Sequence, residues 1–256
     1  MPASMRFAIV FTLLAAWTAP SSARAVGLMP GGRFEVGPVR LDLSQGVRSG
    51  LISLRNNESD VARVQVSAFA WSQGPHGEVR LAPTQAVAFF PSLFALAPGQ
   101  TRQIRVGVEA RAGKTEKTFR LIIAELPPLR ATPVVNGVRV LTRLSIPIFV
   151  APVSGSAQVR LSHLALSRGH VSFALGDTGQ VHLMTERVRV LGSDAAGNVI
   201  FKADQPAWYL LAGGDRLYDL ALPKNLCPRL TSIDVVARTD HGTVSKSHPM
   251  SAPQCG

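Results

Sequence analysis

The chain has 256 residues, with 27 Lys and Arg against 16 Asp and Glu, so its formal net charge is +11 at neutral pH. Apolar residues make up 46% and charged residues 17%, which excludes a disordered chain, because such chains contain few hydrophobic residues. Aromatic residues are only 6%, too few for a surface on which nucleic-acid bases stack, and two cysteines cannot build a four-cysteine zinc site.

The first 25 residues have the pattern of a secretory signal peptide. Arg6 precedes an apolar run, Phe7 to Trp17, and small residues stand at the two positions that a signal peptidase reads, Ala23 and Ala25. The run is too short to span a bilayer comfortably, although a retained membrane anchor is the alternative. We expect cleavage after Ala25, which removes two arginines, lowers the charge from +11 to +9 and leaves an exported chain.

The first half of the remaining chain predicts β-strands, because apolar residues alternate with period two and Gly, Pro and Asn separate the runs. No stretch shows a sustained helical period. Seven short strands are typical of an immunoglobulin-like sandwich. The predicted strands are Arg33–Leu43, Ser49–Arg55, Ala62–Trp71, Ser92–Leu96, Thr101–Glu109, Lys117–Leu126 and Gly137–Val150.

The second half repeats this rhythm after a short linker of small residues and proline, Ala151 to Ser156. We therefore predict an all-β chain of two immunoglobulin-like β-sandwich domains, residues 26–153 and 154–256, each long enough for its own core. The predicted strands are Ala157–Leu166, His170–Leu175, Glu186–Leu191, Asn198–Lys202, Arg216–Leu222, Leu230–Ala237 and Thr243–Lys246.

The two cysteines, Cys227 and Cys255, are predicted to form a disulfide, because an exported protein reaches an oxidising compartment. Such a bond ties the C-terminal tail to the second domain. Two free thiols or a metal-binding pair are the alternatives, and no His or Cys stands nearby at a ligand spacing.

Sequence motifs for catalysis are absent. There is no Gly-x-Ser-x-Gly, His-Glu-x-x-His or Gly-x-Gly-x-x-Gly, and the six His residues are scattered. Gly113-Lys-Thr115 resembles the end of a phosphate loop, but it lies between two predicted strands rather than before a helix. We expect no enzyme, no cofactor and no metal. The arginines within strands favour a cleft that grips a carboxylate, since a guanidinium binds carboxylates bidentately.

Five stretches of the first half, within residues 34–152, resemble the periplasmic pilus-assembly chaperones of the chaperone–usher pathway, the PapD-like family. The most specific is Phe119-Arg-Leu-Ile-Ile-Ala-Glu-Leu-Pro-Pro128. The form Pro147-Ile-Phe-Val resembles the divergent archaic branch. The others are Gly37–Leu43, Val47–Asn57, Leu96–Val106 and Val138–Pro152.

The resemblance implies two immunoglobulin-like domains in an L-shaped arrangement and a location in the periplasm. It implies pilus subunits and an outer-membrane usher as partners, with neither nucleic acid nor a small-molecule substrate. The chaperone lends an edge strand to an incomplete subunit, here within residues 137–148, and alternate side chains of that strand enter the subunit core. Self-association of the free chaperone is a further expectation, because an exposed apolar edge tends to pair. The residues of the lent strand are Val138, Val140, Thr142, Leu144 and Ile146.

The same resemblance implies a cationic anchor for the subunit's C-terminal carboxylate. Its first member falls on Arg40, but the position of the second, a Lys in the family, is Pro147. Arg143, on the same strand parity, and Arg105, on a neighbouring predicted strand, are the candidates for that role. Glu125 in the family pairs with an Arg just before the hinge, where this chain has Ala151, so Glu125 needs another partner.

Two other classes of protein remain open on sequence grounds. The chain could be a secreted adhesin or a structural subunit of a fibre, although only about eight residues precede Arg33 after cleavage, which is short for a donor extension. A secreted β-sandwich hydrolase with a site built across loops is the other alternative.

Overall fold

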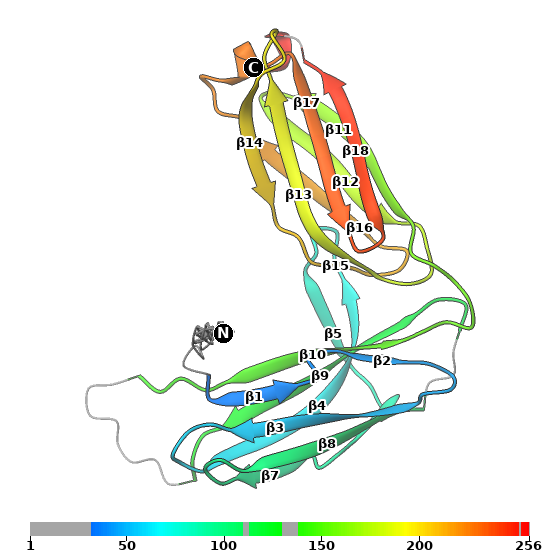
Figure 1. Cartoon of the computed structure of the whole chain (residues 1–256), viewed down its shortest axis with the longest axis vertical. Helices are drawn as coiled ribbons and strands as arrows, with labels where there is room; N and C mark the ends of the chain where they lie inside the picture. Colours follow the sequence, from blue (N-terminus) through cyan, green and yellow to red (C-terminus); the bar gives the residue numbers. More distant parts are fainter. Residues whose placement is uncertain (1–31, 110–112, 130–137, 251, 256) are drawn as a thin grey trace, which may run out of the picture. The chain divides into compact units, whose positions relative to one another are not determined.

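The computed structural model describes residues 32–109, 113–129, 138–250 and 252–255 (Figure 1). The described residues form β-strands, with two short 3₁₀ helices at Cys227–Arg229 and Ala252–Cys255. The fold is therefore all-β, as predicted. None of the described residues lies in a helix long and apolar enough to cross a membrane.

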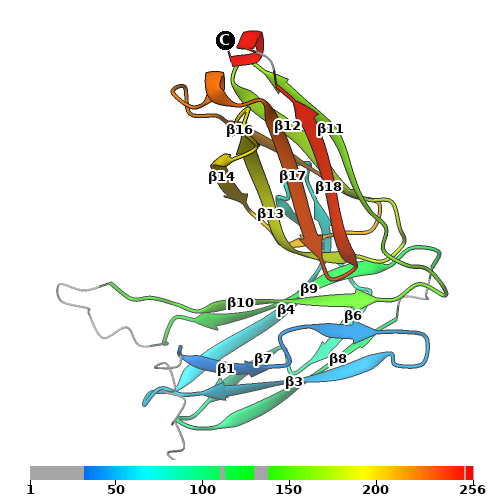
Figure 2. The ribbon, with the colours of Figure 1, turned by 45° about the horizontal axis from the view of Figure 1, so that its top comes forward.

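The first sandwich pairs two sheets. One has the order β1-β3-β8-β6, and the other has the order β2-β10-β9-β4-β5 with β7 paired to β4 (Figures 1 and 2). The strand bounds are β1 Phe34–Gly37, β2 Leu41–Leu43, β3 Ser49–Asn56, β4 Ala62–Gln73, β5 Val79–Pro83, β6 Val87–Phe90, β7 Leu93–Leu96, β8 Thr101–Val108, β9 Lys117–Leu126 and β10 Arg143–Val150.

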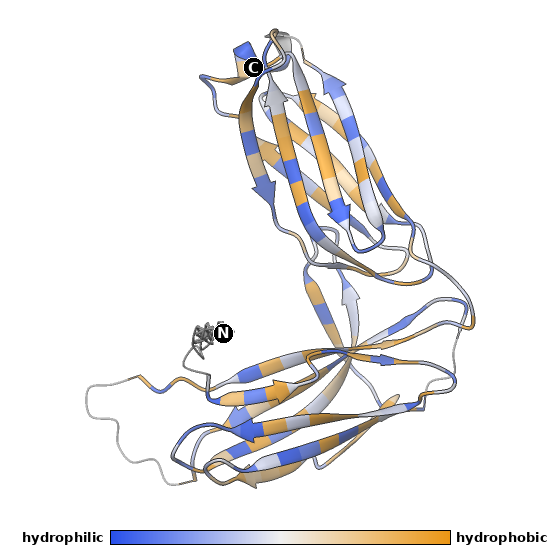
Figure 3. Ribbon diagram, in the orientation of Figure 1, coloured by the Kyte–Doolittle hydropathy of each residue, from blue (hydrophilic) through white to orange (hydrophobic). Residues whose placement is uncertain are grey.

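The core of this sandwich follows from the period of two. Alternate residues of each strand point between the sheets, so Ile52 of β3, Ile104 of β8 and Leu121 of β9 are fully buried. Hydrophilic and hydrophobic residues accordingly alternate along the ribbons (Figure 3). At the β7–β8 turn, Gly99 follows Pro98 and has a φ of +69°, the positive φ that the third residue of a type II turn requires.

The second sandwich has its own sheets and core. One sheet has the order β11-β12-β16, and the other has the order β14-β13-β17-β18 with β15 paired to β13. Phe173, Val188 and Ile233 lie in a core separate from that of the first sandwich. The strand bounds are β11 Val159–Ser167, β12 His170–Asp177, β13 Leu183–Ser193, β14 Val199–Gln205, β15 Tyr209–Leu210, β16 Asp215–Ala221, β17 Ser232–Thr239 and β18 Gly242–Pro249.

Apart from shifts of a few residues at strand ends, the structure differs from the predicted strands in three respects. The predicted strand Arg33–Leu43 is two strands, because β1 pairs with β3 in one sheet and β2 pairs with β10 in the other. The predicted strand Gly137–Val150 is regular only from Arg143, and Gly137 lies outside the described residues. Three short strands, β5, β6 and β15, were not predicted.

The domain limits stay predictions. Every strand pairing in the described residues stays within β1–β10 or within β11–β18, so the chain passes from one set of sheets to the other between Val150 and Val159. The predicted signal peptide lies outside the described residues.

The predicted disulfide is confirmed, and it joins the two 3₁₀ helices across 28 positions of sequence. Replacing Cys227 and Cys255 together by Ala frees a loop of this length in the unfolded chain. We expect the free energy of unfolding of the second sandwich to fall by about 3.5 kcal/mol. Urea denaturation of the wild type, with and without reductant, and of the double variant measures this, and an unchanged midpoint would contradict it.

Candidate functional site

Strand β10 is paired along its whole length on one side only. On that side all eight of its residues pair with β9. On the other side β2 pairs only with Ile148, Phe149 and Val150. Within the described chain, the stretch from Arg143 to Pro147 therefore has an unpaired flank, which we call the open edge. An unpaired strand edge is a template for the addition of another strand.

Two arginines stand beside Pro147, at the end of the open edge. Arg120 of β9 pairs directly with Pro147. Arg40 immediately precedes β2, whose first residue, Leu41, pairs with Ile148, so Arg40 lies just before β2 at the end of the open edge. Residues opposite one another in a sheet share a face. A strand added along the open edge would therefore end where β2 begins, next to Arg40.

Arg120 is a buried cation without a carboxylate partner in the described structure. The residue is 2% exposed, and its guanidinium carbon lies 3.7 Å from the ring centre of Trp71 and 4.7 Å from that of Trp208. Its one hydrogen bond is long, from Nη1 to the Ser145 carbonyl at 3.4 Å, and Nε and Nη2 have none. Burial lowers the pKa of Arg120 to about 10, so the side chain is still charged at neutral pH.

Arg40 is more accessible, with 43% of its side chain exposed, and its Nε lies 2.8 Å from Asp42 Oδ2. Burial lowers the pKa of Arg40, but the charge of Asp42 and a hydrogen bond with Tyr209 outweigh burial and raise that pKa above its usual value. The contact with Asp42 holds the guanidinium beside β2 while leaving part of it open to solvent.

The structure separates the other two predicted anchor residues. Arg143 begins β10 and is exposed, four residues before Pro147 and on the same face of the strand. Arg105 lies in the opposite sheet of the sandwich, and its neighbours Ile104 and Val106 occupy the core. The side chain of Arg105 therefore leaves the outer surface of that sheet and cannot line the row of Pro147, because the core lies between.

The residues predicted for the lent strand also fall into two groups. Ile146 is buried in the core of its own sandwich, and Leu144 packs against that core. Val138 and Val140 belong to no strand and are 91% and 81% exposed. Thr142 is half-buried at the junction. We call residues 138–142 the free segment. Leu144 and Ile146 share the inward face of β10, whereas Val138 and Val140 precede the strand, so the lent strand stays a prediction.

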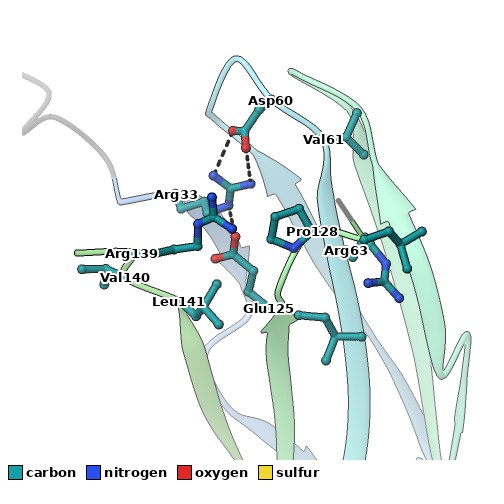
Figure 4. Close-up of a pocket in the computed structure, with 11 residues that line it drawn as sticks. Arg33, Asp60, Val61, Arg63, Glu125, Pro128, Arg139, Val140 and Leu141 are labelled. Carbon is teal, nitrogen blue, oxygen red and sulfur yellow. Dashed lines mark hydrogen bonds and ion pairs between the residues drawn. The ribbon is translucent and has the colours of Figure 1, made fainter. Parts of the chain in front are cut away.

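Glu125 finds its partner in Arg33, close to the free segment (Figure 4). Arg33 Nε lies 2.7 Å from Glu125 Oε1, and its two terminal nitrogens bond both oxygens of Asp60 at 3.0 and 3.2 Å. A pocket of about 380 Å³ opens beside these groups and is also lined by Arg139 and Val140. The antiparallel register places Ala151 at the far end of β10, so no side chain there could reach Glu125.

Sequence reasoning missed both Arg120 and the role of Arg33. Arg120 stands between the apolar Phe119 and Leu121, so the sequence indicates only that its side chain points to the other face of the strand from theirs. Trp71 and Trp208 cover Arg120 on that face, and because both lie far away in sequence, local pattern does not reveal that Arg120 is buried. The described residues contain no cluster of His, Cys, Asp and Glu that could hold a metal ion.

Comparison with protein families identifies the first sandwich. Residues 33–155 match the family described as "Pili and flagellar-assembly chaperone, PapD N-terminal domain", so the first sandwich is similar to that domain. No curated protein sequence is significantly similar to this chain.

Solved structures agree with the fold at low sequence identity. A chain in the CsuC–CsuE chaperone–tip adhesion subunit pre-assembly complex, from archaic chaperone–usher Csu pili of Acinetobacter baumannii, is 15% identical with a TM-score of 0.59, covering 84% of this chain and 97% of that one. A chain in the Salmonella enterica SafA pilin–SafB chaperone complex is 14% identical with a TM-score of 0.53, covering 85% of this chain and 96% of that one. The Pseudomonas aeruginosa CupB2 chaperone is 12% identical with a TM-score of 0.51, covering 84% of this chain and 100% of that one.

Arg120 is expected to contribute little to stability. Arg120→Met loses two cation–ring contacts but also removes the cost of burying an unpaired charge, so the free energy of unfolding should change by no more than about 1 kcal/mol. Asn56 is the contrast, because it is fully buried and fully hydrogen-bonded. Its Nδ2 donates to the carbonyls of Asp60 and Leu96, and its Oδ1 accepts from the Glu58 N–H. Asn56→Ala should cost at least about 2 kcal/mol. Urea denaturation of both variants measures this, and a loss from Arg120→Met as large as that from Asn56→Ala would contradict it.

Proposed function

We propose that this protein is a periplasmic chaperone that binds pilus subunits by lending them a strand and delivers them to an outer-membrane usher. The observation that carries the proposal is the open edge of β10, which continues into a free segment with two exposed valines. Backbone pairing along the edge supplies affinity, and the alternate valines supply apolar contacts to the subunit core. The family of the first sandwich supports this function.

The proposed anchor for the subunit's C-terminal carboxylate is the pair Arg40 and Arg120. Arg120 pairs with Pro147 and Arg40 lies just before β2, so two arginines near Pro147 would supply the charge that a lysine there would carry. Arg120 has nitrogens without hydrogen-bond partners, and a carboxylate would satisfy them. Arg143 is the alternative second member if the bound strand is displaced along β10.

The anchor can be tested by co-expression with a secreted pilin-like subunit from the same organism. Arg40→Ala and Arg120→Met should each weaken the purified complex about 30-fold or more, because each leaves a carboxylate without its charged partner. Dissociation rates by surface plasmon resonance measure this. Arg143→Ala should have little effect, and the reverse ranking would move the anchor to Arg143.

A matched change in the subunit shows whether the arginines act on its carboxylate. Three glycines added to the subunit's C-terminus displace the carboxylate and should weaken the wild-type complex to a similar degree. The same addition should cost little more in the Arg40→Ala background, because both changes remove one interaction. Fully additive losses would contradict the anchor. Recovery of this protein in sheared fibres would favour the alternative of a fibre subunit.

The free chaperone is expected to associate with itself through the open edge, because Val138 and Val140 are exposed beside an unpaired strand. Sedimentation velocity of the pure protein should show a dimer that grows with concentration. Val140→Lys should shift this equilibrium to monomer, since a lysine on the edge opposes pairing. A wild type that stays monomeric at the highest concentration would refute self-association.

A further inference from the structure

The point at which β10 separates from β9 is unusual. Arg143 pairs with Ala124, so the next antiparallel pair is Thr142 with Glu125. Facing residues of a hydrogen-bonded pair exchange two backbone bonds. Here the Glu125 N–H donates to the Thr142 carbonyl at 2.8 Å, but the Thr142 N–H donates to the Glu125 carboxylate, Oε2, at 3.1 Å. The side chain of Glu125 takes the place of its own carbonyl.

Glu125 is held in this position by a charged partner. Its side chain is only 8% exposed, and Arg33, 18% exposed, contacts the other carboxylate oxygen, Oε1. Arg33 in turn forms an ion pair with Asp60, whose side chain is 69% exposed (Figure 4). A largely buried carboxylate that has both a cation and an N–H donor is fixed in one place, because losing either partner leaves a buried charge unsatisfied.

We propose that Glu125 and Arg33 are positioning residues that end the β9–β10 pairing at Thr142 and so fix the first residue of the free segment. This inference rests on the proposed strand-lending function. A lent strand that enters a groove must pair on both of its sides. The stretch Arg143–Pro147 has only one free side, since β9 occupies the other. Among the described residues, 138–141 belong to no strand, and the bonds between Thr142 and Glu125 mark where this stretch meets β10.

The end of the pairing at Thr142 therefore determines how far Val138 and Val140 extend beyond the chaperone's own sheet. If pairing with β9 continued past Thr142, these valines would be held against the chaperone's own sheet. If pairing ended earlier, the segment would be longer and less ordered, and its binding would have a larger entropic cost. A single charge-assisted hydrogen bond thus sets how far the two valines can extend into a subunit.

The first measurement needs only the free protein. The Thr142 N–H, which donates to Glu125 Oε2, should exchange slowly with solvent deuterium in the wild type and faster in Glu125→Ala, as ¹H–¹⁵N NMR measures. Arg189→Met, on the second sandwich, is the control and should leave this exchange rate unchanged. Equal protection of the Thr142 amide in the wild type and in Glu125→Ala would overturn the inference.

The second measurement is subunit release, with the secreted pilin-like subunit as the probe. Glu125→Ala removes the acceptor for Thr142 and should speed release about tenfold or more, whereas Glu125→Gln keeps an acceptor oxygen and should recover much of that loss. Arg33→Met should resemble Glu125→Ala. Arg189→Met is the matched control, because it removes an arginine pair of 2.7 Å with Asp204 on the second sandwich.

The outcomes separate the inference from the function on which it rests. If the wild type does not bind the subunit, the proposed function fails, whatever the NMR result. If the wild type binds and Glu125→Ala releases the subunit no faster than Arg189→Met, the positioning role is overturned while strand lending stands. Equal release by Glu125→Ala and Glu125→Gln would also overturn it, because the acceptor oxygen would then have no effect.

Discussion

The unequal pairing of β10 is the constraint on which the rest of the molecule depends. One side of the strand is fully paired with β9, while β2 covers only its last three residues on the other side. Full pairing on one side makes β10 part of a rigid sheet with Ile146 and Ile148 in the core. Missing pairs on the other side leave backbone donors and acceptors toward solvent. A rigid strand with one open flank is pre-organised for strand addition, so the proposed binding would lose little conformational entropy.

Two further features near this flank are unfavourable for the free protein. Val138 and Val140 expose apolar surface to water, and Arg120 carries a buried charge with no counter-charge among the described residues. Each lowers stability for no structural gain. A bound strand that ends in a carboxylate would relieve both, because it would cover the valines and could satisfy the free nitrogens of Arg120. Their places at the two ends of the open edge are therefore better explained by a partner than by folding.

Much of the fold follows from local sequence, whereas the site depends on long-range contacts. Strands such as Lys117–Leu126 were predicted with the observed bounds, because alternation and flanking turn residues determine them locally. The short β6 was missed, since four residues before Pro91 carry too little pattern. The true start of β10 was unpredictable for another reason: the Glu125 carboxylate stops the pairing, and its position depends on Arg33, 92 positions earlier in the chain.

Register explains why an open edge should be bounded by charged groups at both ends. A slip of one residue between paired strands turns every side chain to the opposite face, which would remove both valines from the subunit's core. Backbone hydrogen bonds alone do not oppose such a slip, since every residue offers the same groups. Charges do, because a carboxylate that misses its guanidinium by one residue loses the interaction. Glu125 fixes β10 against β9 near Thr142, and the arginines beside Pro147 would fix the incoming strand against β10. With both relationships set, the proposed strand lending would place the valines in one register only.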